Sequence, residues 1–102
     1  MLNELLAIFD VVDRVLEKRQ VNTAQRIRDK VLVTIYKLGN EGSQAVTPVQ
    51  LETEGGFSKL QISDVIEVAK NKNWIIDASS FGGMAWMLKQ EAIYYVKGLL
   101  ES

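Results

Sequence analysis

Two helix starts stand close together in residues 47–61, TPVQLETEGGFSKLQ. Thr47 and Ser58 are each followed three residues later by a glutamine, the capping-box pattern that satisfies the free N–H groups at a helix start. Pro48 occupies the first helical position after Thr47, where proline is favoured. The glycine pair at 55–56 ends the first helix, so the stretch predicts two helices joined by a tight turn, a helix-turn-helix.

A β-hairpin is predicted directly after the second of these helices. The inner face of that helix recurs at helical spacing and consists of Ile62, Val65, Ile66 and Ala69. Asn73 is suited to the left-handed conformation that closes a helix. Residues 73–88, NWIIDASSFGGMAWML, place two apolar runs around a Gly-Gly turn. This pattern predicts strands at 74–79 and 84–88, in which Trp74 and Trp86 meet across the hairpin.

Further amphipathic helices are predicted on both sides of this unit. Residues 24–38 form one that ends at Gly39, and its second half is apolar almost all round, which requires cover on two sides. A last helix at 90–101 turns four residues inward: Ala92, Tyr95, Val96 and Leu99. The whole chain, residues 1–102, has the length of a single domain.

The first helix is predicted at 2–19 and carries an apolar seam. The seam residues alternate at spacings of three and four, and they are Leu2, Leu5, Phe9, Val12 and Leu16. Two heptads are too few for an independent coiled coil, so the seam needs another surface to cover it. Two alternatives stay open: the helix packs on its own domain, or it pairs with a second copy of the chain to make a homodimer.

The composition excludes several classes of function. The chain has no Cys and no His, which removes disulfides, Cys/His zinc sites and His-based catalysis. It has no glycine-rich phosphate loop, nucleophile motif or metal-ligand spacing, so we expect neither an enzyme nor a cofactor. No apolar run reaches the length of a membrane span, and the N-terminus lacks the basic leader of a signal peptide. We therefore expect a cytoplasmic protein that does not enter a membrane.

The order of the predicted elements resembles the winged-helix superfamily of small prokaryotic transcription regulators over about residues 24–97. In that family the return strand of the hairpin, or wing, reads aromatic, any residue, Leu, Thr, two polar residues and Gly. Residues 86–92, WMLKQEA, follow this pattern except at Lys89 and Ala92, and Asn73 stands where the family has a Gly before the wing. The expected fold is mainly α with a small β-hairpin (α+β). It is a winged helix-turn-helix, residues 24–102, with an added N-terminal amphipathic helix like the dimerising helices of such regulators.

The resemblance implies a transcriptional regulator that binds double-stranded DNA as a homodimer, with the helix at 58–72 in the major groove. The contacts expected at the start of that helix are Ser58, Lys59, Gln61 and Ser63. A second basic region lies where the first two helices meet. The sequence from Lys18 to Lys30 contains five basic residues and one acidic residue, Asp29. The candidate phosphate contacts in this region are Arg26, Arg28 and Lys30. The alternative is that these are solvated charges around a loop.

Charge opposes DNA binding on the helix and on the wing. By 100° steps, the outer ridge of the helix consists of Leu60, Asp64, Glu67 and Asn71. The sequence from Glu41 to Glu67 contains five acidic residues and one basic residue, and the only charged residue in 73–88 is Asp77. Phosphates are held chiefly by Lys and Arg, so this face would repel a duplex. A second function therefore stays open, in which the winged helix binds a partner protein through the acidic ridge or the apolar wing.

Phe81 lies at the predicted tip of the wing. It could enter a minor groove as a wedge, pack on a partner protein, or fold back onto the hairpin near Met84. We include it among the candidate DNA contacts.

Overall fold

The computed structural model describes residues 2–79 and 83–101. Within these residues the chain forms five helices and one two-stranded antiparallel sheet. The elements are α1 (Leu2–Lys18), α2 (Thr23–Leu38), α3 (Pro48–Thr53), α4 (Lys59–Asn71), β1 (Ile75–Asp77), β2 (Trp86–Leu88) and α5 (Gln90–Leu100). The prediction of a mainly helical chain with a small sheet is confirmed, and the strands are shorter than the apolar runs suggested.

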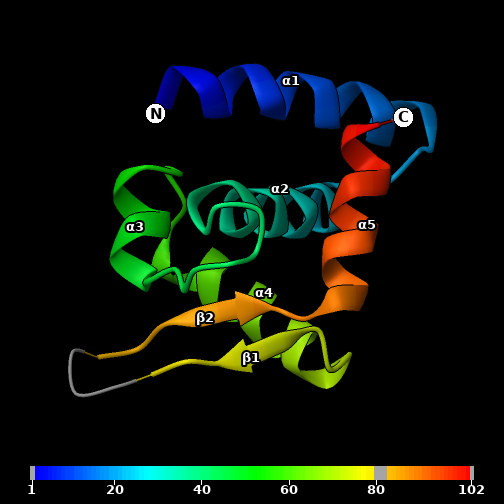
Figure 1. Cartoon of the computed structure of the whole chain (residues 1–102). Helices are drawn as coiled ribbons and strands as arrows, with labels where there is room; N and C mark the ends of the chain where they lie inside the picture. Colours follow the sequence, from blue (N-terminus) through cyan, green and yellow to red (C-terminus); the bar gives the residue numbers. More distant parts are fainter. Residues whose placement is uncertain (1, 80–82, 102) are drawn as a thin grey trace.

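The helix α2 lies at the centre of the molecule. Figure 1 shows α1 on one side of α2, α4 and the sheet on the other, and α5 running from the sheet back to α1. Six successive residues of α2, from Val31 to Tyr36, are buried. The expectation that this helix is covered on two sides is confirmed.

Both capping boxes are present and fix where α3 and α4 begin. The side chain of Thr47 accepts from the N–H of Gln50 at 3.2 Å, and Gln50 Oε1 accepts from the N–H of Thr47 at 2.9 Å. Ser58 and Gln61 exchange the equivalent hydrogen bonds at 3.1 and 2.9 Å. Asn73 has a φ of 60°, the left-handed conformation expected after α4. These local contacts determine the angle at which the chain enters α4 and leaves it for the sheet.

The register of the sheet corrects one expectation. Trp86 lies opposite Asp77 across the strands, so it does not meet Trp74. Trp74 packs instead on Tyr95 of α5, with 5.0 Å between the ring centroids. The other edge of β2 pairs with Val46, whose N–H and carbonyl both bond to the backbone of Trp86. The two tryptophans therefore belong to different parts of the core.

The apolar seam of α1 is covered by the chain itself. Its described members are all buried, and they are Leu5, Phe9, Val12 and Leu16, while the side chain of Leu2 lies outside the described residues. The ring of Phe9 meets the ring of Phe57 edge-on at 5.8 Å. The helix packs on its own domain, the first of the two alternatives, so these residues offer no free surface to a second copy. A homodimer built on the seam would require α1 to leave this core.

Candidate functional site

The helix α4 is packed against different elements on its two sides. One side meets α2, and the other meets α3 and the sheet. The four inner residues predicted from spacing are all buried, and they are Ile62, Val65, Ile66 and Ala69. The outer ridge faces solvent, with Leu60 83% exposed and Asp64 and Glu67 also exposed. We call the two flanks the α2 side and the hairpin side.

On the α2 side, an ion pair joins the predicted basic region to the predicted acidic ridge. Arg28 Nε lies 3.0 Å from Asp64 Oδ2, and Arg28 Nη2 lies 3.4 Å from Asp64 Oδ1. The hydrogen bond from Arg28 holds the pKa of Asp64 below its usual value, and the same bond raises the pKa of Arg28. Arg28 was expected to attract DNA and Asp64 to repel it, and the ion pair neutralises both charges.

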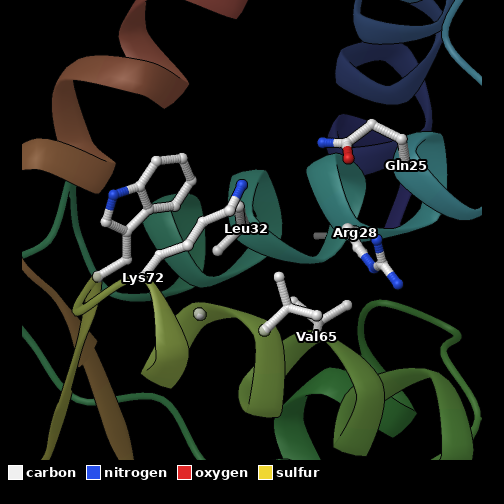
Figure 2. A pocket seen from close by; sticks show the side chains of 8 residues that line it. Gln25, Arg28, Leu32, Val65 and Lys72 are labelled. Atoms are coloured by element: carbon white, nitrogen blue, oxygen red, sulfur yellow. The ribbon is translucent and has the colours of Figure 1, made fainter.

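The hollow beside this ion pair is too small for a ligand. Figure 2 shows Gln25 and Arg28 from the start of α2, Leu32 and Val65 in the middle, and Lys72 from the end of α4. The enclosed space is about 10 Å³, which corresponds to one water molecule. The ammonium of Lys72 lies 4.7 Å from the centre of the Trp74 ring, and this cation–π contact joins two of the residues that line the hollow. The α2 side of α4 is therefore closed.

The candidate phosphate contacts all bind other parts of the chain. Besides the Arg28 pair, Lys30 Nζ lies 2.9 Å from Asp13 of α1, and Arg26 Nε donates to the carbonyl of Val21 at 3.2 Å. A phosphate would have to compete with these partners. The structure therefore favours a structural use of the three residues, at the contacts of α2 with α1, with the connection that precedes α2, and with α4.

A buried carboxyl group lies deeper on the same side of the molecule. Asp29 is 0% exposed, and its Oδ1 accepts from the hydroxyl of Tyr95 at 2.8 Å and from Gln25 Nε2 at 3.1 Å. Burial raises the pKa of Asp29, although both hydrogen bonds and the charges of Lys72 and Arg19 act in the opposite direction. Burial and the neighbouring Asp29 raise the pKa of Tyr95 to about 12. Sequence reasoning counted Asp29 only as a surface charge and missed this link between α2 and α5.

On the hairpin side, an open groove of about 330 Å³ runs between α3, α4 and the start of β2. Its apolar lining consists of Pro48 from α3, Ile62 and Ile66 from α4, and Met84 and Trp86 from the hairpin. Its polar lining consists of Glu52, Lys59, Ser63 and Lys70. The volume falls in the range of small-ligand and side-chain pockets, whereas the hollow on the α2 side does not.

Trp86, one of the residues that line this groove, carries an unpaired indole donor. Trp86 is 3% exposed, and its Nε1 is buried without a hydrogen-bond partner among the described residues. A buried donor without an acceptor costs about 1–3 kcal/mol. The atom is closed to solvent in this structure, so an acceptor in the groove would reach it only if the Trp86 side chain moved.

The contacts predicted at the start of α4 divide into two groups. Ser58 and Gln61 use their side-chain oxygens in the capping box, while Lys59 and Ser63 line the groove. Phe81 lies outside the described residues. The sequence therefore identified part of the groove lining, although it assigned those residues to DNA.

No protein-family model matches the chain, and comparisons with curated proteins and with solved structures find no match either. Among the described residues, none of the helices has both the length and the apolar character needed to cross a membrane.

Proposed function

We propose that the chain is a winged helix-turn-helix module that binds a segment of a partner protein in the groove on the hairpin side of α4. The winged-helix assignment is supported by the order of the elements, in which α3 and α4 form a capped helix-turn-helix and the hairpin and α5 follow. The observation that carries the function is the groove itself. Its volume of about 330 Å³ contrasts with the closed α2 side of the same helix.

The lining of the groove suits an apolar side chain better than a nucleic acid. Ile62, Ile66 and Trp86 line the groove but are themselves buried, so the 58% exposed Met84 and the half-buried Pro48 supply most of its exposed apolar surface. Burying apolar surface stabilises a complex by about 25 cal/mol per Å². Partner segments commonly anchor through one or two large apolar residues in a pocket of this kind. On the exposed ridge Asp64 is neutralised by Arg28 and Glu67 is acidic, so the ridge does not attract phosphates.

Selection from random peptides displayed on phage tests this proposal. The wild type should enrich peptides with large apolar residues, and Met84→Asp should abolish their binding. Met84 is 58% exposed, so this substitution should leave the fold intact, which circular dichroism verifies. Leu60→Asp, on the exposed ridge outside the groove lining, is the matched control and should bind like the wild type. Enriched peptides that bind Met84→Asp as well as they bind the wild type would rule the proposal out.

Double-stranded DNA binding by a homodimer is the second candidate function. It is favoured by the helix-turn-helix and by the bases that flank α4, Lys59 and Lys70 on one side and Arg28 and Lys72 on the other. Fluorescence anisotropy with a random duplex in about 50 mM salt decides it, because non-specific affinity is strongest at low salt. Binding at micromolar protein that falls steeply with salt would support this candidate, and no binding would remove it. Sedimentation of the wild type tests the homodimer.

A further inference from the structure

Two lysines line the groove from the same side of α4. Lys59 and Lys70 are eleven residues apart, which places them on one ridge about 16 Å apart along the helix axis. Neither side chain forms an ion pair or a hydrogen bond with another described residue. The apolar lining from Ile62 and Ile66 lies between them. The groove therefore has an apolar middle with an unpaired positive charge toward each end.

The groove is more positive than the molecule as a whole. Its lining carries two lysines against one acid, Glu52, whereas the whole chain has a net charge of −1. By contrast, the charge of Arg28 on the α2 side is neutralised by Asp64. Unpaired charges at the rim of an apolar pocket govern which partners bind and how fast they associate.

We propose that the groove takes an acidic and apolar segment of a partner protein, with large apolar side chains on the middle of the groove and a carboxylate toward each lysine. This inference rests on the proposed function and specifies its partner. An extended segment of about five residues spans the distance between the lysines.

The two lysines should contribute unequally. Hydrogen bonds from Ser79 lower the pKa of Asp77, and the charge of Lys70 adds to this effect, so Lys70 lies within electrostatic range of a carboxylate of its own chain. Lys59 forms no ion pair or hydrogen bond with another described residue, and Glu52 lines the groove together with both lysines. The carboxylate at the Lys59 end should therefore contribute more to binding than the one at the Lys70 end.

The test begins with the peptides that the wild type selects from the random phage library. They are labelled with fluorescein, and their affinities are measured by anisotropy against wild type, Lys59→Glu, Lys70→Glu and Lys97→Glu. Lys97 is an exposed residue of α5 outside the groove lining, so its reversal makes the same change in net charge elsewhere. We expect enriched peptides that combine large apolar residues with Asp or Glu. Lys59→Glu should weaken the binding of these peptides about tenfold, Lys70→Glu should weaken it less, and Lys97→Glu should have no effect.

The outcomes separate the inference from the function on which it rests. Enriched peptides without acids, sensitive to Met84→Asp but unaffected by Lys59→Glu, would overturn the acidic partner and leave the groove as a binding site. Peptides whose binding is weakened equally by Lys59→Glu and Lys97→Glu would overturn the acidic partner as well, because only the net charge of the protein would then matter. Peptides insensitive to Met84→Asp would overturn both proposals. Acidic peptides that bind more tightly to Lys59→Glu would contradict the inference directly.

Discussion

The two sides of α4 use the same kinds of residue to opposite effect. On the α2 side, Arg28 is paired with Asp64, Lys72 covers Trp74, and the remaining space is about 10 Å³. On the hairpin side, Lys59 and Lys70 form no ion pair or hydrogen bond with another described residue, and the space is about 330 Å³. Arg28 and Lys72, bound by a carboxylate and an aromatic ring, close a helix contact, whereas the two lysines that form no such direct contact remain available to a partner.

The difference follows from what packs against each flank. A helix of sixteen residues covers the α2 side and brings its own polar side chains over the contact. A strand of three residues and a helix of six cover the hairpin side, and these are too short to fill the space along α4. The experiments below break or sharpen this contrast, beginning with the largest expected effect.

The largest effect should come from the closed side. Leu32 is 4% exposed and packs from α2 into the hollow beside Val65, so Leu32→Ala should lower the free energy of unfolding by about 2–5 kcal/mol. Met84→Ala, its counterpart on the open side, should change it by no more than about 0.5 kcal/mol. Urea unfolding followed by circular dichroism measures both. Equal losses for the two variants would mean that the hairpin side is as tightly packed as the α2 side.

A smaller effect, visible as a pH dependence, should come from Asp29. Burial raises its pKa in the folded chain above the usual value of 3.8, so the folded state binds more protons than the unfolded state in this range. The contribution of Asp29 to stability is therefore highest at acidic pH and is lost as the pH rises through the raised pKa. Asp29→Asn has no proton to lose, so the variant should gain stability relative to wild type as the pH rises from the usual pKa of 3.8 through the raised pKa of the folded chain.

Unfolding curves at several pH values test this prediction. Asp77→Asn is the control, because the pKa of Asp77 is lowered and its contribution runs the other way, being lost as the pH falls. Parallel pH profiles for wild type and Asp29→Asn would show that the carboxyl group is not buried as described.

The smallest effect should come from the exposed ion pair. Both side chains of the Arg28–Asp64 pair are partly in contact with solvent, and such pairs contribute little to stability. Arg28→Ala should lower the midpoint of thermal unfolding only slightly, and less so at high salt. Exchanging the two residues, as Arg28→Asp with Asp64→Arg, should restore the midpoint. If Arg28→Ala destabilises the chain as much as Leu32→Ala does, the α2 side depends on charge and not on packing.

Local patterns allowed much of the fold to be predicted, because they depend on neighbours in sequence. The capping boxes at Thr47 and Ser58 and the left-handed Asn73 were all read from residue types at fixed spacing. Side-chain contacts between distant residues were missed, and the predicted contact of Trp74 with Trp86 was wrong. The Arg28–Asp64 pair spans 36 positions and the Tyr95–Asp29 bond spans 66, and no local pattern marks either one. The lining of the groove shows the same difference. Its α4 residues follow from helical spacing, whereas Met84 and Trp86 join them only through the tertiary fold.

The two tryptophans provide the most direct test, because Trp86 lines the open groove and Trp74 lines the closed hollow on the other side of α4. Their indole N–H groups give separate signals in a proton–nitrogen NMR spectrum, so a titration with a selected peptide reports on both sides at once. The account predicts that the Trp86 signal shifts with saturation while the Trp74 signal stays in place. A shift of Trp74 with Trp86 unchanged would place the binding surface on the α2 side and contradict the central claim.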